Sequence, residues 1–193
     1  GACPQTEPVA NLIYGVLASL DGYVNDASGG FEWAAPDEEV HAHVNALERE
    51  TGTYLYGRRM YDVMQVWESM DLTDEPPVMR DYALLWREAE KVVYSTTLEA
   101  AATDRTRLAK VWDPEEVRRL KAEAERPVSI GGPTLAALAL RDGLVDEIHL
   151  YLTPVLVGGG TRALPEGVRL DLALRDEHRF ASGVVHLHYD VRR

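Results

Sequence analysis

The sequence predicts one α/β domain in which helices flank a mixed sheet and antiparallel strands extend that sheet at the C-terminal end. Up to residue 143, short apolar runs alternate with helical patterns, which is typical of parallel strands joined by helices. From Asp146 onward, apolar and polar residues alternate with period two, which is typical of antiparallel strands with one exposed face. The chain has 193 residues, 46% of them hydrophobic and 27% charged, which suits a single domain with its own core.

Composition excludes several classes of function. A net charge of −12 disfavours nucleic acid and anionic membranes as partners. The single cysteine, Cys3, excludes a disulfide framework and a cysteine zinc site, and we expect no metal site. No apolar run reaches the roughly 20 residues that span a bilayer, and no signal peptide is evident. We therefore expect a cytoplasmic protein with a disordered N-terminus over residues 1–8 and one domain over residues 9–193.

The first half of the chain begins with a strand over residues 12–18, whose apolar run without alternation indicates burial on both faces. A small, polar loop follows over residues 25–30. Pro36 and the acidic residues after it open a helix that runs to about Glu50. A short strand over residues 53–56 then leads into a second helix that opens at Gly57.

The middle of the chain continues the alternation. We expect a helix over residues 77–89 and strands over residues 91–94 and 108–112. Asp113 and Pro114 mark the start of the next helix, because aspartate is a good cap and proline suits the first helical position. A buried strand over residues 127–130 precedes the last helix, which Gly143 ends.

The final third predicts three strands, over residues 148–152, 168–174 and 185–191. Polar residues occupy one face of each, so we expect the histidines there to be solvated: His149, His186 and His188. The two helical histidines, His41 and His43, are likewise expected on the surface.

Three turns, each predicted to join a strand to a helix, carry the residues suited to chemistry: Gly57-Arg58-Arg59, Ser95-Thr96-Thr97 and Gly131-Gly132-Pro133-Thr134. In an open α/β sheet, ligands bind beyond the carboxyl ends of the strands, where such turns gather. A helix start attracts phosphate through its unpaired N–H groups, and glycine lets an anion approach the backbone. The alternative for the glycine pair is a purely structural turn.

These turns, together with Ser19-Leu20-Asp21-Gly22 and the segments at residues 144–147 and 153–160, resemble the dihydrofolate-reductase-like fold. The resemblance is closer still to the reductase domain of the bifunctional riboflavin-biosynthesis deaminase-reductase and its stand-alone relatives. It spans almost the whole chain in the family's order. It implies an NADPH-dependent reductase that forms a homodimer through its C-terminal strands.

The resemblance also implies roles for single residues. Gly57, Arg58 and Arg59, with Ser95 and Thr96, would hold the adenosine 2′-phosphate and flank the adenine. The pyrophosphate would lie at Gly131, Gly132 and Thr134, with a cis Gly-Gly peptide as in the family. Met60 departs from the family, which often has a hydroxyl residue at this position.

The substrate side is less sharply specified. Trp33 would cap the substrate pocket or serve as a core aromatic. Asp21 would bind substrate or form the turn before Gly22, and it is a second candidate for the catalytic role. Glu38 would be the catalytic acid or an ordinary capping charge of its helix. The glycine run at residues 158–160 would border the cofactor or make a wide turn.

The expected function is therefore NADPH-dependent hydride transfer to a small heterocycle of the pterin/dihydrofolate or ribosylamino-pyrimidine type. The zinc-dependent deaminase half is absent, because one cysteine cannot supply its ligands. The alternative is a catalytically inactive nucleotide-binding or dimerisation module on the same fold. On the reductase interpretation, Gly132→Val should cut NADPH affinity more than it cuts stability.

Overall fold

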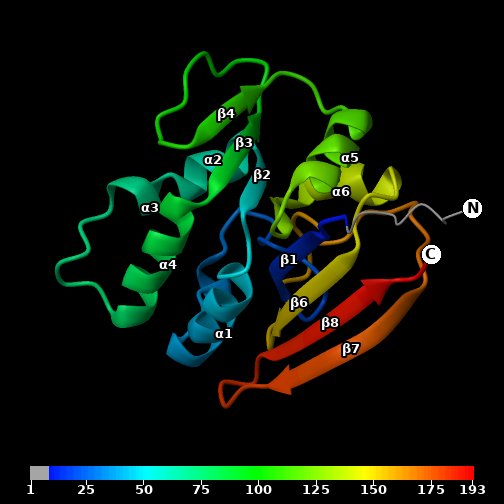
Figure 1. Cartoon of the computed structure of the whole chain (residues 1–193). Coiled ribbons are helices and arrows are strands. Elements are labelled where there is room, and N and C mark those ends of the chain that lie inside the picture. The colour runs from blue at the N-terminus through cyan, green and yellow to red at the C-terminus, as the bar shows by residue number, and fades with distance from the viewer. Residues whose placement is uncertain (1–8) are drawn as a thin grey trace, which may run out of the picture.

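An eight-stranded sheet forms the centre of the structure, a computed structural model in which residues 9–193 are described (Figure 1). Its strand order is β4-β3-β2-β5-β1-β6-β8-β7. The strands are β1 (Leu12–Ser19), β2 (Thr53–Gly57), β3 (Glu90–Tyr94), β4 (Thr106–Ala109), β5 (Val128–Gly131), β6 (Glu147–Thr153), β7 (Leu172–Arg179) and β8 (Val185–Val191). The predicted disorder of residues 1–8, and Cys3 with it, lies outside the described residues.

Six of the strands are parallel. β1 lies between β5 and β6, as the unbroken apolar run of residues 12–18 predicts, and both pairings are parallel. β8 then pairs antiparallel with β6, and β7 pairs antiparallel with β8. The prediction of an antiparallel β6 is wrong on its β1 side, because the helix between β5 and β6 returns the chain in the same direction. The α/β class with antiparallel strands at the C-terminal end is confirmed.

Helices cover both faces of the sheet. One face is covered by α1 (Glu38–Glu48), α2 (Arg58–Met64), α3 (Val66–Ser69) and α4 (Pro77–Glu88). The other is covered by α5 (Pro114–Glu123) and α6 (Pro133–Arg141). A short 3₁₀ helix, η1 (Glu32–Ala34), precedes α1. Figure 1 shows β8 and β7 at the outer side of the sheet, beyond β6.

The core is divided by the sheet, because neighbouring side chains of a strand point to opposite faces. Tyr14 and Leu55 are fully buried on the face of α5 and α6. Tyr54 and Tyr56 point the other way and stack with their ring centroids 5.5 Å apart. Trp86 of α4 packs there and donates a 2.9 Å hydrogen bond from Nε1 to the Tyr56 hydroxyl. A rigid aromatic layer therefore supports the carboxyl end of β2.

The predicted helix starts and stops are confirmed at several positions. The Asp113 carboxylate caps α5 by accepting from the Glu115 N–H at 3.0 Å. Gly143, with a φ of +69°, follows the end of α6 in the left-handed conformation expected after a helix.

Two strand boundaries were predicted wrongly. β4 is Thr106–Ala109 rather than residues 108–112, because it can pair with β3 only as far as Tyr94↔Ala109. β7 begins at Leu172 rather than at residue 168, because its partner β8 ends at Val191, opposite Leu172. Val168 and Leu170 pack against the core outside any strand.

The histidine prediction is wrong in an informative way. His149 and His186 are each only 3% exposed, since α1 covers this face of β6 and β8. His43 of α1 also faces the sheet, where its Nδ1 lies 2.8 Å from the Tyr151 hydroxyl. Alternation identifies the two faces of a strand, but it does not say which of them another element covers.

No helix within residues 9–193 is both long enough and apolar enough to cross a bilayer.

Candidate cofactor and substrate site

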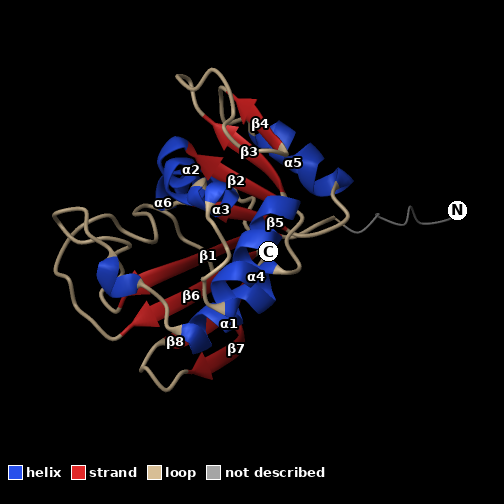
Figure 2. Ribbon diagram, turned by 90° about the vertical axis from the view of Figure 1, so that its left-hand side faces the viewer, coloured by secondary structure: helices blue, strands red, loops and turns tan. Residues whose placement is uncertain are grey.

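The three predicted turns lie side by side at the carboxyl ends of neighbouring strands. β3, β2 and β5 are neighbouring parallel strands, so their carboxyl ends meet at the same edge. Gly57 pairs with Tyr94, the residue before Ser95, and Tyr56 pairs with Gly131. β1 and β6 end at the same edge, and Figure 2 shows long loops gathered beyond their arrowheads. The sheet therefore brings together turns that are separated by about 75 residues of chain.

Gly57 offers an open surface at the first of these turns. It ends β2 and caps α2 with an ordinary backbone conformation, φ −77° and ψ 171°. A Cβ added there would meet no atom within 4 Å. Arg58 and Arg59, in the first turn of α2, are both exposed. Arg58 forms an ion pair with Asp62 at 2.9 Å, whereas Arg59 forms none with any residue of 9–193. An anion at this turn would meet two accessible guanidinium groups.

Ser95 and Thr96 follow β3, but no helix begins there, and this part of the prediction is wrong. The chain makes a turn instead, in which the Ser95 hydroxyl accepts from the Leu98 N–H at 3.0 Å. Ser95 is buried, whereas Thr96 is exposed. The helix-dipole argument therefore does not apply at Ser95, and of the two predicted ligands Ser95 and Thr96, Thr96 is the exposed one.

Gly131 and Gly132 make a turn that itself requires glycine. Gly132 has a φ of +91°, which side chains rarely adopt. A Cβ on Gly131 would lie 2.7 Å from Cε1 of the buried Tyr56. The structural alternative therefore accounts for both glycines, whether or not they also border a ligand. The expected cis Gly-Gly peptide is wrong, since the bond is trans.

Met60 packs against this glycine turn. Cβ atoms built on Gly131 and Gly132 would lie 3.3 and 3.4 Å from Met60 side-chain atoms. Thr134, in the first turn of α6, is exposed. The side chain that departs from the family pattern thus lies next to the predicted pyrophosphate position.

Asp21 acts as a turn-former. Its carboxylate accepts from the Ser19 hydroxyl at 2.6 Å and from the N–H groups of Gly158 and Val157 at 2.8 and 3.2 Å. The hydrogen bond from Ser19, with those from the two N–H groups, holds the pKa of Asp21 below its usual range. Because such a group stays ionised at neutral pH, it is poorly suited to donate a proton.

The glycine run at residues 158–160 packs against the loop after β1. The Thr161 N–H donates to Asn25 Oδ1 at 2.8 Å, and the Val24 N–H donates to the Thr161 carbonyl at 2.8 Å. A Cβ on Gly160 would lie 1.9 Å from the Asn25 carbonyl oxygen. The two loops therefore form one unit beyond β1 and β6, and close backbone contact explains Gly160.

A pocket of about 210 Å³ lies beside these loops, beyond the ends of β1 and β6. Trp33 lines it, which agrees with the pocket alternative of its two expected roles rather than the core alternative, and its Nε1 donates to the Gly30 carbonyl at 3.3 Å. Glu38 is exposed on α1 and is not among the lining residues. Asp37 does line the pocket, but its carboxylate caps α1 by accepting from the Val40 N–H at 3.0 Å. The lining residues are Leu17, residues 33–37, Val40, Thr153, Pro154, Ser182 and Val184.

Sequence reasoning missed the C-terminal side of this pocket. Thr153 ends β6, and Ser182 lies in the turn between β7 and β8, about 150 residues from Trp33. No local pattern marks either residue, because their proximity depends on how β8 folds back along β6.

The sheet order and the loops beyond its carboxyl ends define an α/β domain whose fold is shared with riboflavin-biosynthesis proteins of solved structure. The chain belongs to the RibD C-terminal domain family, whose profile matches residues 10–186. It is 26% identical over 183 residues to the uncharacterized protein YyaP of Bacillus subtilis, covering 92% of this chain and 93% of YyaP. It is 27% identical over 171 residues to the riboflavin biosynthesis protein RibD of Mycobacterium tuberculosis. That match covers 84% of this chain but only 47% of RibD.

Solved structures show the same fold. A protein from Shewanella sp. PV-4, provisionally described as a riboflavin biosynthesis protein, matches with a TM-score of 0.75 and 22% identity. The match covers 95% of this chain and 99% of that one. A diaminohydroxyphosphoribosylaminopyrimidine deaminase/5-amino-6-(5-phosphoribosylamino)uracil reductase from Thermotoga maritima matches with a TM-score of 0.68 and 14% identity. The match covers 95% of this chain and 57% of the bifunctional protein.

Proposed function

We propose that this protein is an NADPH-dependent reductase that acts on a small heterocycle of the ribosylamino-pyrimidine type. The observation that carries the proposal is the row of turns at the ends of β3, β2 and β5, continued by the pocket beyond β1 and β6. Neighbouring strands lie about 4.8 Å apart, so this row is long enough for an extended dinucleotide. Membership of the reductase-domain family supports both the reaction and the cofactor.

The residues of the turns at the ends of β3, β2 and β5 suit NADPH. The open space at Gly57 would admit phosphate oxygens close to the backbone, and the exposed Arg58 and Arg59 would pair with the 2′-phosphate. Thr96 and the N–H groups at the start of α6 would add donors. NADPH supplies a hydride when bound, so the protein's own part is to hold two ligands in contact and exclude water.

The pocket indicates which substrates it would accept. A volume of about 210 Å³ is below the range of roughly 300–1,000 Å³ for drug-sized ligands, and it suits a compact substrate. Its lining residues, all within the described part of the chain, include no lysine or arginine. A buried phosphate needs cationic or N–H partners. We therefore propose a substrate without a phosphate group, unlike the phosphoribosylamino compound in the name of the Thermotoga protein.

Asp37 is the one acid among the lining residues, and its Oδ1 caps α1. We propose that water at the pocket mouth supplies the proton that accompanies the hydride. The catalytic role predicted for Glu38 has no support from the pocket geometry.

Turnover tests this proposal. Purified protein should oxidise NADPH in the presence of a ribosylamino-pyrimidine, and the unphosphorylated compound should be used better than its phosphate ester. Dihydrofolate and pterins serve as comparison substrates. No NADPH oxidation with any of these compounds would contradict the reductase proposal, and preference for the phosphate ester would contradict the substrate class alone.

Met60 favours a second candidate, a nucleotide-binding or dimerisation module without catalysis. Its side chain occupies the position beside Gly132 where the family often has a hydroxyl donor. This candidate predicts that the protein binds NADPH but does not oxidise it. The turnover experiment described above therefore distinguishes the two proposals.

Cofactor preference follows from the arginine pair. We expect NADPH to bind more tightly than NADH by roughly 10- to 100-fold, since hydrogen bonds to a charged group contribute about 1.5–3 kcal/mol. The double variant Arg58→Ala/Arg59→Ala should remove most of that preference and leave NADH affinity nearly unchanged. Calorimetric titration with NADPH and with NADH measures both affinities in the wild type and in the double variant. The control is Arg118→Ala, which removes an exposed arginine of α5. If the preference for NADPH over NADH survives the double variant, the argument for this phosphate site fails.

We also propose a homodimer through β7, which forms one edge of the sheet. Its Leu172 and Leu174 are 36% and 54% exposed, so a partner strand would bury apolar surface and satisfy the free backbone edge. Light scattering should give twice the 21.5 kDa chain mass. Leu174→Arg should yield monomers, whereas Leu84→Arg, at a leucine of α4 that is 53% exposed, should not. A wild-type monomer at high concentration would refute the assembly.

A further inference from the structure

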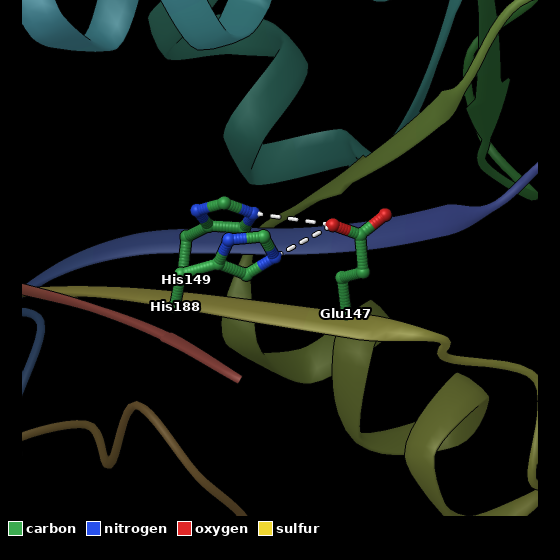
Figure 3. A group of neighbouring side chains, drawn as sticks. All are labelled: Glu147, His149 and His188. Carbon is green, nitrogen blue, oxygen red and sulfur yellow. Dashed lines mark hydrogen bonds and ion pairs between the residues drawn. The ribbon is translucent and has the colours of Figure 1, made fainter. Parts of the chain in front are cut away.

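We propose that Glu147, His149 and His188 form a binding site for one zinc ion at the amino end of β6. Glu147 and His149 are two residues apart on β6, so their side chains share a face, and His188 is paired with His149 across the ladder to β8. One potential ligand atom from each residue lies within 4.8 Å of the other two. Figure 3 shows both imidazole rings directed at the same carboxylate oxygen of Glu147.

A buried nitrogen at the centre of this cluster lacks a hydrogen-bond partner. The side chain of His149 is 4% exposed, and no group in the described chain forms a hydrogen bond with its Nε2. The nearest oxygen, Glu147 Oε1, is 3.7 Å away, which is too far for a hydrogen bond. Burying an unsatisfied nitrogen is costly, and such groups in native proteins call for an explanation. A cation between His149 Nε2 and Glu147 Oε1 supplies one.

The separations are close to those that zinc requires. Zinc binds histidine nitrogen and carboxylate oxygen at about 2.0–2.2 Å, so two ligands of a tetrahedral ion lie about 3.3 Å apart. Glu147 Oε1 is 2.7 Å from His188 Nε2 and 3.7 Å from His149 Nε2, on either side of that value. The two rings stack with centroids 3.9 Å apart, so small rotations of both are needed to turn their nitrogens toward one ion. Two histidines and one glutamate are an established zinc ligand set, with a fourth position left for water.

Neighbouring side chains hold the ligands as outer-shell partners do in known metal sites. Asn11 Nδ2 donates to Glu147 Oε2 at 2.8 Å, whereas Oε1 lies within hydrogen-bond distance of His188 Nε2, a contact that the ion would replace. His149 Nδ1 lies 2.9 Å from His186 Nε2. If His149 donates its Nδ1 proton to His186, its Nε2 is unprotonated and faces the cluster. Imidazole ligands favour zinc over magnesium or calcium, which prefer oxygen.

The site lies at the opposite end of β6 from the proposed cofactor row. β6 runs seven residues from Glu147 to Thr153, a length of about 20 Å. Its ligands join β6 to β8, and Asn11 ties in the chain before β1. Zinc would therefore fasten the antiparallel part of the sheet to the parallel part rather than take part in hydride transfer. This inference does not depend on the proposed reductase function.

The test is zinc binding by the full chain after metal removal. Equilibrium dialysis with elemental analysis should give one zinc per chain, and zinc should raise the melting temperature. Cobalt(II) in place of zinc should give the visible absorption of a four- or five-coordinate site. Glu147→Gln and His188→Gln, at two partly exposed positions, should each weaken zinc affinity by more than about 100-fold, beyond the range for an outer-shell loss. His186→Phe should weaken it by about 10- to 100-fold.

His178→Gln is the matched control, since His178 lies exposed on β7 outside the ligand set. It should leave zinc affinity unchanged. The proposal is overturned if wild-type protein binds no stoichiometric zinc at micromolar concentrations of the free ion. It is also overturned if both ligand variants bind zinc as tightly as the wild type.

Discussion

Gly57→Val should lower NADPH affinity by at least roughly 10- to 100-fold while the protein stays folded. A Cβ at Gly57 would meet no atom within 4 Å apart from its chain neighbours, so the protein leaves room there for a branched side chain to begin. The backbone there is extended, at φ −77° and ψ 171°, so any residue can adopt it. A ligand in that space would collide with the new side chain. Calorimetry measures the affinity, and thermal unfolding should show a loss of about 1 kcal/mol or less from the altered helix cap.

The control for this variant is Ala122→Val, which enlarges an exposed residue of α5 far from the turns. It should leave both NADPH affinity and melting temperature close to wild type. A folded Gly57→Val protein with normal NADPH affinity would show that the cofactor does not approach the end of β2.

Gly132→Val should lower stability and NADPH affinity together. Gly132 has φ +91° and ψ 134°, a conformation that β-branched residues essentially never adopt. Strain of this kind costs on the order of 1–3 kcal/mol, which corresponds to about 2–12 °C in melting temperature for a chain of this size. The sequence-based expectation that stability suffers less than binding is therefore revised, because the turn needs glycine for its own backbone.

A second substitution, at Met60, identifies the cause of the stability loss in Gly132→Val. A Cβ on Gly132 would also lie 3.4 Å from Met60 Cβ, a close contact that Met60→Gly would remove, whereas alanine would keep the Cβ. If backbone strain dominates, Gly132→Val should destabilise the Met60→Gly protein by nearly as much as it destabilises the wild type. Full recovery of the melting temperature in the double variant would assign the loss to the methionine contact instead.

Local signals allowed most of the fold to be predicted from the sequence. The cap at Asp113, the glycine after α6 and the unbroken apolar run of β1 each fix an element through forces within a few residues. The row of three turns was predictable too, because parallel strands joined by helices place their carboxyl ends on one edge.

Features that depend on distant partners could not be predicted in this way. The boundaries of β4 and β7 are set by where β3 and β8 end. His149 and His186 are buried because α1, which ends 101 and 138 residues earlier in the chain, covers their face. Ser95 turns toward its own loop because no helix follows β3. The zinc ligand set likewise depends on the pairing of β6 with β8, which alternation alone does not reveal.

A crystal structure of the protein with NADPH tests the central claim most directly. The claim predicts the adenosine phosphate beside Gly57, Arg58 and Arg59, the pyrophosphate at the Gly131–Gly132 turn, and the nicotinamide directed at the pocket beside Trp33. NADPH bound elsewhere on the domain, or no NADPH at concentrations that saturate the protein in solution, would contradict it.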